Sequence, residues 1–281
     1  MPVDQGGADQ ARAESIRPGN GDPNSFGGGV WIREYVSGAC GAEGFSTGTA
    51  ILESGSVLAY HTHSFSEAIT ILSGEARLNV QGRSYRLTAF DCLHVPRGVA
   101  HEVRNDSPDF PLLALWAFAS AEPSRELVQQ SFAIIDRGMS GPAPDDPESI
   151  VRFQQAEIYQ LSEGALFRDL FAGRFGSVGI CGGYGVFQPG ASLPCHIHEY
   201  DESITIVEGE AVCLVQGNRY RLSGRDTAFV PTGRPHRFLN HSDSPMAMIW
   251  VYAGTEPERS LVDAGHCEGT LAWPASVQGG I

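Results

Sequence analysis

The stretch "CHIHEYDESITIVEGE" at residues 195–210 opens with two histidines one residue apart and continues through carboxylates into a strand-like run. A second stretch, "HTHSFSEAITILSGE" at residues 61–75, has the same pattern. When residues 55–105 are laid over residues 190–240, nearly half of the positions are identical. This similarity indicates a tandem duplication, so a site found in one copy is expected in the other.

Both copies consist of short alternating runs that are rich in β-branched residues, such as "EAITIL" and "ESITIV". Glycine or polar turns separate these runs, with a spacing of about 8 to 12 residues that is typical of all-β sandwiches and barrels. Strands alternating with helices would need longer periods. The pattern therefore predicts an all-β fold in each copy.

The histidine spacing has a physical reason on a strand. Residues i and i+2 project from the same face, about 6.6 Å apart at the backbone, so His61 and His63 can approach one metal ion. Glu67 lies four residues further on and reaches the same ion only if residues 64–66 bend. In both copies a Pro-x-Gly turn precedes a third histidine, which is His101 or His236. The predicted ligands are His61, His63, Glu67 and His101 in the first copy, and His196, His198, Glu202 and His236 in the second.

These motifs resemble those of the cupin superfamily. Its first motif is matched by Gly55, His61, His63, Glu67 and Gly74, and again by Gly190, His196, His198, Glu202 and Gly209. Its second motif is matched by Pro96, Gly98, His101 and Asn105, and again by Pro231, Gly233, His236 and Asn240. One departure is visible, since Phe90 and Arg225 stand where a glycine usually opens the second motif. The resemblance implies a bicupin, with two tandem double-stranded β-helix (jelly-roll) barrels that each hold one divalent metal.

The domain boundaries follow from the repeat. We expect a disordered lead over residues 1–29, an N-terminal cupin domain over 30–135, a linker over 136–164, a C-terminal cupin domain over 165–265 and a tail over 266–281. The linker contains "ESIVRFQQAEIYQ" after a proline, which favours a short helix. The fold is therefore expected to be all-β with a short, partly helical linker.

Composition excludes several functions. The net charge is −14 and every basic residue is an arginine, so nucleic-acid binding is disfavoured and lysine Schiff-base chemistry is excluded. No stretch approaches the roughly 20 apolar residues of a membrane span, and the first residues lack the apolar core of a secretion signal. The six cysteines form no C-x-x-C pair. We expect reduced thiols in a cytoplasmic protein that is a monomer or a homodimer.

Several residues have no expected chemical role. His94, His241 and His266 have no counterpart in the other repeat and are interpreted as ordinary surface or core histidines. Strand alternation should point Cys195 away from the metal. Trp116 and Trp250 lie in apolar strands and are expected in the core. No residue is singled out for catalysis beyond the metal ligands.

Three imidazoles and one carboxylate suit Fe(II), Mn(II), Ni(II), Co(II) or Zn(II), and iron is the first choice because such sets with open positions suit O₂ chemistry. The leading hypothesis is an O₂-dependent dioxygenase acting on a small anionic phenolic, enol or dicarbonyl substrate that chelates the metal. The alternatives are a redox-neutral isomerase or decarboxylase, a non-enzymatic sugar- or acid-binding module, and a regulator. The ligand surroundings differ between the copies, which predicts unequal roles for the two sites.

Overall fold

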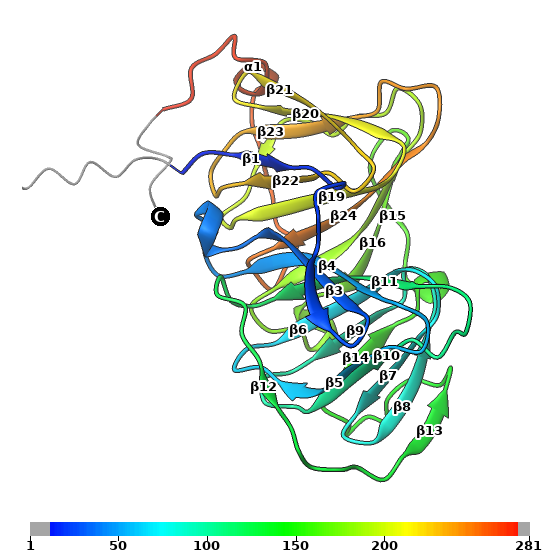
Figure 1. The fold of residues 1–281 in the computed structure, drawn as a ribbon. Helices are drawn as coiled ribbons and strands as arrows, with labels where there is room; N and C mark the ends of the chain where they lie inside the picture. Colours follow the sequence, from blue (N-terminus) through cyan, green and yellow to red (C-terminus); the bar gives the residue numbers. More distant parts are fainter. Residues whose placement is uncertain (1–11, 275–281) are drawn as a thin grey trace, which may run out of the picture.

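The structure is a computed structural model that describes residues 12–274, and it contains two β-barrels in tandem (Figure 1). In the first barrel, one sheet has the order β14-β9-β6-β11-β4-β3-β2 and the other has the order β12-β5-β10-β7-β8-β13. The first sheet comprises β2 (Asn24–Gly27), β3 (Val30–Val36), β4 (Ser46–Leu52), β6 (Glu67–Ser73), β9 (Cys92–Val95), β11 (Leu112–Phe118) and β14 (Ser149–Val151). The second comprises β5 (Val57–Thr62), β7 (Ala76–Val80), β8 (Arg83–Leu87), β10 (His101–Arg104), β12 (Glu126–Leu127) and β13 (Ile135–Gly138).

The second barrel repeats this plan, with sheet orders β1-β22-β19-β24-β17-β16-β15 and β21-β20-β23-β18-β25. Its larger sheet comprises β1 (Ser15–Arg17), β15 (Tyr159–Ser162), β16 (Ala165–Phe171), β17 (Cys181–Phe187), β19 (Glu202–Glu208), β22 (Thr227–Val230) and β24 (Met246–Tyr252). Its smaller sheet comprises β18 (His196–Ile197), β20 (Glu210–Val215), β21 (Asn218–Ser223), β23 (His236–Leu239) and β25 (Ser260–Leu261). The described residues contain one short α-helix, α1 (Ala264–Glu268). The predicted all-β fold of two barrels is confirmed.

The two larger sheets pack against each other through their outer faces. On β6, Ile69 and Ile71 point into the first barrel, whereas Ala68 belongs to an apolar cluster that also contains Phe171 and Phe229 of the second barrel. Successive side chains of the strand therefore point alternately into the core of the first barrel and into the apolar cluster between the barrels. This explains why strands such as "EAITIL" are apolar on both faces.

The two repeats exchange their first strands. β1 precedes the first barrel in the chain but pairs with β22 of the second, so that Ser15 faces Phe229. β14 belongs to the second repeat but pairs with β9 of the first, so that Ser149 faces His94 at the equivalent position. Both barrels are thus completed by a strand from the other half of the chain.

This exchange corrects two sequence-based expectations. The segment 1–29 was expected to be disordered, but β1 and β2 lie within it; residues 1–11 are outside the described residues. The linker is partly helical, as expected, but the helix is a single 3-10 turn, Phe153–Gln155, and the strands β14 and β15 lie at the two ends of the predicted helical stretch. In the tail, residues 266–268 belong to α1, and residues 275–281 lie outside the described part. Pairing with a sheet edge overrides the weak helix signal.

The departure from the cupin glycine leaves the turn intact. Phe90 and Arg225 both adopt positive φ, 65° and 75°, which is the left-handed region that a glycine would favour. Their backbone N–H groups donate to Ile71 and Ile206, respectively. These hydrogen bonds hold the two residues in a conformation that is uncommon for non-glycine residues.

Candidate metal centres

The structure brings together all eight residues that the sequence singled out. In each barrel one ligand atom from each of the four residues lies within 4.8 Å of the others, and all eight residues are buried. His61 is the penultimate residue of β5, His63 follows its last residue, Glu67 begins β6 and His101 begins β10. In the second barrel His196 begins β18, His198 follows its last residue, Glu202 begins β19 and His236 begins β23.

The turn of the second motif is hydrogen-bonded to the backbone of the second histidine in the first motif. The expected bend falls between Thr62, where β5 ends, and Glu67, where β6 begins. The backbone N–H of Gly98, in the Pro-x-Gly turn, donates to the carbonyl of His63 over 2.8 Å. Gly233 donates to His198 over the same distance. The turn of the second motif therefore positions the pair of histidines in the first.

Every histidine of the two centres is oriented by a backbone carbonyl. In the first centre Nδ1 lies 2.8 Å from the carbonyl oxygen of Ala59 for His61 and 3.0 Å from that of Val99 for His101, and Nδ1 of His63 lies close to that of Ser124. In the second centre the carbonyls belong to Pro194, Glu258 and Arg234. Since a carbonyl only accepts, Nδ1 donates, and Nε2 of each ring is directed at the other members of the centre. When a ring is neutral, this Nε2 carries the lone pair that a metal ion binds.

Those inward atoms form a donor set that fits a cation. Oε2 of Glu67 lies 2.7 Å from Nε2 of His101 and 3.1 Å from Nε2 of His63. Nε2 of His198 and of His236 and Oε2 of Glu202 are buried without a hydrogen-bond partner among residues 12–274. Buried lone pairs gathered in this way repel each other unless a proton or a cation lies between them. Three nitrogens and one carboxylate are a usual set for a divalent transition metal.

The electrostatics keep both carboxylates ionised, as metal binding requires. Burial by itself would raise the pKa of Glu67, but the charge of His63 and hydrogen bonds from His101 and His63 outweigh it and lower the pKa below its usual range. Burial, together with the neighbouring His101, lowers the pKa of His61 to about 3. The second centre follows the same pattern, since burial lowers the pKa of His196 and the histidines lower that of Glu202 against the effect of burial. The carboxylates are therefore ionised, and these two histidines neutral, near pH 7. Burial by itself would lower the pKa of His63, but the charge of Glu67 and its hydrogen bond raise it, so metal binding must displace a proton from this ring more often than from His61.

The first barrel contains a cavity that reaches its centre. The cavity has a volume of about 420 Å³ and is in contact with His61, His63 and Glu67. Its other lining residues are mostly apolar: Asn24, Phe26, Ile32, Glu34, Ala50, Leu52, Leu58, Ile69, Val103, Ala114, Trp116, Phe118, Pro123, Ser124 and Arg125. A volume of this size is within the range of small-molecule pockets, about 300–1,000 Å³.

At five of the positions that line this cavity, the second barrel has larger side chains. Phe167, Phe187, Phe238, Met248 and Tyr252 replace Ile32, Leu52, Val103, Ala114 and Phe118, respectively. All five of the larger residues are buried in one continuous core. The two centres therefore share their ligands but differ in the space beside them.

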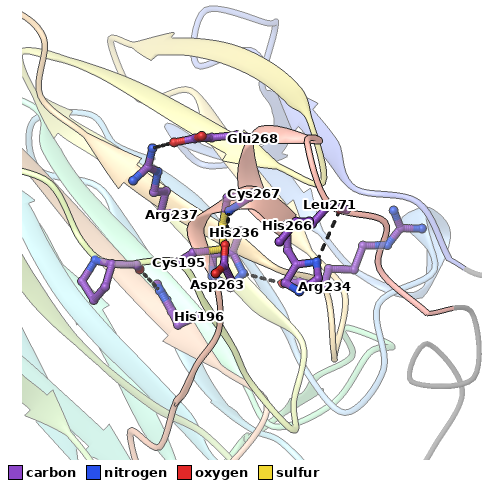
Figure 2. The surroundings of a disulfide bond; sticks show 12 residues. Cys195, His196, Arg234, His236, Arg237, Asp263, His266, Cys267, Glu268 and Leu271 are labelled. Atoms are coloured by element: carbon purple, nitrogen blue, oxygen red, sulfur yellow. Dashed lines mark hydrogen bonds and ion pairs between the residues drawn. A yellow bond between two sulfur atoms is a disulfide. The ribbon is translucent and has the colours of Figure 1, made fainter.

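The sequence did not predict the disulfide between Cys195 and Cys267. Figure 2 shows that this bond joins the residue before His196 to α1. The expectation of six reduced thiols is wrong for this pair, whose 72-residue separation carries no motif. Cys195 packs with Val212 and Leu239, outside the barrel core, so it does point away from the centre as predicted. Disulfides are rare in the cytosol, so a cytoplasmic location remains a prediction that this bond does not favour.

The remaining sequence predictions concern single residues. Trp116 and Trp250 are buried in the barrel cores, as expected. His94 is buried and pairs with Ala68, which belongs to the apolar cluster between the barrels, and His241 is exposed. Within residues 12–274, no helix has the length and apolar character needed to cross a membrane.

Comparison with known proteins agrees with this architecture. The cupin domain family matches residues 48–118 and 183–252. The tetracenomycin polyketide synthase protein TcmJ of Streptomyces glaucescens is 30% identical over 94 residues; the match covers 32% of this chain and 63% of TcmJ, so the chain spans less than two thirds of that relative.

Solved structures of oxalate decarboxylases share the fold. One of them comes from a study of a reaction-specificity switch and has a TM-score of 0.73 and 17% identity to this chain. The alignment covers 88% of this chain and 79% of the oxalate decarboxylase chain. The formate complex of the Lactobacillus farciminis enzyme has a TM-score of 0.71 and 16% identity and covers 88% of both chains. At such identities the likeness shows the fold alone. With two cupin domains and two buried His/Glu centres, the chain belongs to the cupin family as a bicupin.

Proposed function

We propose that this bicupin is a metal-dependent enzyme whose reaction takes place in the N-terminal barrel. The observation that carries the proposal is the cavity of about 420 Å³ in contact with His61, His63 and Glu67. Catalysis needs room for a substrate beside the metal, and large side chains fill the corresponding space in the second barrel. The second centre would then bind metal without processing substrate.

The eight residues of the two centres are the proposed metal ligands, one divalent ion per barrel. When bound, such an ion supplies a Lewis acid and a template for a chelating pair of oxygens. The chain contributes neutral Nε2 donors held by backbone carbonyls and a single carboxylate charge. This leaves the centre with a net charge of +1, which favours an anionic chelating group. Iron is the first choice, with manganese, nickel, cobalt and zinc as the other candidates.

The cavity wall indicates the substrate class. Its apolar residues, including Leu52, Leu58 and Trp116, would surround the apolar part of an enol, phenol or dicarbonyl compound and exclude water from it. That apolar part would have about the size of an aromatic ring system. Oxalate itself fits poorly, because a small dianion gains nothing from apolar walls. Polyketides carry repeated carbonyl groups, so the similarity to a polyketide synthase protein supports a dicarbonyl substrate.

We favour redox-neutral chemistry at the carbon next to a carbonyl of the substrate. That carbon would lose a proton or CO₂. It would then regain a proton, which gives isomerisation or decarboxylation, or form a bond to a second carbonyl carbon, whose oxygen takes the proton, which gives ring closure. The resemblance to oxalate decarboxylases, which concerns the fold, supports this choice. Glu34 is the one carboxylate besides Glu67 that lines the cavity, and it accepts a hydrogen bond from Ser37. It is therefore the candidate for moving the proton.

An O₂-dependent dioxygenase is the second candidate. The specific observation in its favour is the donor set of three nitrogens and one carboxylate, which suits Fe(II) when positions remain open. The two candidates share the substrate class and the barrel, and they differ in whether oxygen is consumed.

The test is turnover of a panel of aryl 1,3-diketones and dihydroxynaphthalenes by metal-loaded protein, in air and under nitrogen, with an oxygen electrode. We expect activity in wild type and in the His196→Ala/His198→Ala variant, and none in His61→Ala/His63→Ala. Equal activity under nitrogen supports the redox-neutral candidate, and stoichiometric oxygen uptake supports the dioxygenase. Activity that survives only in the His61→Ala/His63→Ala variant would refute the assignment to the N-terminal barrel.

A further inference from the structure

Arg125 lines the cavity of the first barrel and is adjacent in sequence to a residue that orients a proposed metal ligand. It follows Ser124, whose carbonyl accepts the hydrogen bond of His63 Nδ1. Its guanidinium carbon lies 3.9 Å from the centroid of the Phe26 ring, which also lines the cavity. The guanidinium is therefore held on one face by an aromatic ring and lies at the wall of the cavity.

The charge of Arg125 has no ion-pair partner in the described part of the chain. Nη1 is buried and, within residues 12–274, has no hydrogen-bond acceptor, and no carboxylate of these residues forms an ion pair with the side chain. Other arginines of comparable burial are paired: Arg83 with Glu148, and Arg234 with Glu14. Burial lowers the pKa of Arg125, as expected for a cation without a nearby anion. A buried guanidinium N–H without an acceptor costs free energy unless a ligand supplies the acceptor.

We propose that Arg125 binds an anionic group of the substrate, which is therefore an acid with an apolar, aromatic-sized body. The body would lie against the apolar wall, and a carboxylate or a comparable anion would accept hydrogen bonds from the guanidinium. The location rests on the proposed function, because it takes the N-terminal cavity to be the substrate site. The recognition of charge is a separate property, and it can be measured without turnover.

The second repeat provides a matched control. Arg259 occupies the position equivalent to Arg125. The backbone carbonyl of the preceding Glu258 accepts from Nδ1 of His198, just as that of Ser124 accepts from Nδ1 of His63. The space beside this centre is filled by Phe167 and Tyr252. An arginine at the same position, beside this packed core, should not bind the ligand.

The experiment compares two fluorescent probes on metal-loaded protein. 1-Anilinonaphthalene-8-sulfonate has an aromatic body and an anionic group, and N-phenyl-1-naphthylamine has the same body without the charge. We expect Arg125→Gln to weaken sulfonate binding by about 10- to 100-fold, the range for a hydrogen bond to a charged group, and to change binding of the neutral probe less than about twofold. Arg125→Lys should retain part of the sulfonate affinity, and Arg259→Gln should change neither probe.

Three outcomes would overturn the proposal. The first is an unchanged sulfonate affinity in Arg125→Gln. The second is an equal loss of affinity for both probes in that variant, which would mean that Arg125 only shapes the cavity. The third is a loss of sulfonate affinity in Arg259→Gln that equals the loss in Arg125→Gln. Absence of turnover on every tested substrate would count against the proposed function and leave the probe result intact, so the two failures are distinguishable.

Discussion

Glu14 and Glu148 occupy equivalent positions in the two repeats, and each carboxylate is buried against the barrel of the other repeat. Glu14 accepts hydrogen bonds from Arg234 over 2.9 Å and from Tyr220 over 3.1 Å. Glu148 accepts from Arg83 and from Tyr85 at 2.7 Å. The strand that follows each glutamate, β1 or β14, completes the sheet of that barrel. The halves of the chain are thus interdependent.

The Glu14→Gln substitution tests this interdependence. It leaves the guanidinium of Arg234 largely buried without its counter-charge, and we expect a loss of about 3 kcal/mol in the free energy of unfolding. The measurement is denaturant unfolding of the whole chain. The control is Glu268→Gln, since Glu268 is half exposed and its ion pair with Arg237 should contribute less than about 1 kcal/mol. Equal effects of the two substitutions would contradict the role of Glu14.

The parts of the molecule that the sequence predicted are those that follow strand periodicity. The spacing of His61 and His63 and the repeated turns define the barrels and the two centres. The exchanged strands were missed because a three-residue strand such as β1 has no periodicity of its own, and its partner β22 lies more than 200 residues away. The cavity was missed for a different reason, because its volume depends on several side chains from separate strands. Only the structure shows that Ala114 on β11 and Val103 on β10, which belong to different sheets, line the same cavity.

Replacing Glu67 or Glu202 by Gln should release metal from the corresponding barrel. The change keeps the size of the side chain but removes the single negative charge of each centre, and a carboxylate is a better ligand for a divalent ion than an amide. Elemental analysis after full reconstitution should give two equivalents for wild type and about one for each variant. The exposed Glu75→Gln substitution is the control. Full metal content in both variants would show that neither glutamate is a ligand.

Removing the disulfide should destabilise the second barrel. Cys195 and Cys267 enclose a loop of 72 residues, for which loop-closure entropy predicts about 4 kcal/mol; measured losses are commonly about 2–5 kcal/mol. We expect Cys195→Ser/Cys267→Ser to lower the melting temperature and the metal affinity of the second centre, because Cys195 adjoins His196. Cys40→Ser, at a free thiol, should change neither. Non-reducing peptide mapping checks the bond, and finding both thiols free would contradict it.

Acid should destabilise the interface between the barrels through His94. Burial lowers the pKa of this side chain to about 4, and neither ring nitrogen has a hydrogen-bond partner among the described residues. The unfolded chain, with a histidine pKa near 6.5, therefore binds more protons than the folded chain between about pH 6.5 and 4, and stability is lost as the pH falls through this window.

Phe229 occupies the equivalent position of the other barrel, so His94→Phe is a conservative exchange. We compare the free energy of unfolding of the variant with that of wild type at each pH. The difference in favour of the variant should be about 2 kcal/mol larger at pH 5 than at pH 7.5. Thermal unfolding at the two pH values measures the difference. A gain that does not depend on pH would mean that packing, not protonation, distinguishes the two residues.

Filling the cavity should abolish ligand binding without loss of metal. Ala114→Met and Val103→Phe give the first barrel the residues that stand at the equivalent positions of the second, Met248 and Phe238. Both positions line the cavity, and neither residue is a proposed ligand, so two equivalents of metal should remain. The double variant should lose binding of the neutral naphthylamine probe and all turnover. Because the added side chains enter existing space, its melting temperature should not fall as it does when a packed core is overfilled.

The reciprocal variant, Met248→Ala/Phe238→Val, should keep wild-type turnover, since the first barrel is untouched. If the filled barrel still turns over substrate while the reciprocal variant does not, the reaction belongs to the second barrel.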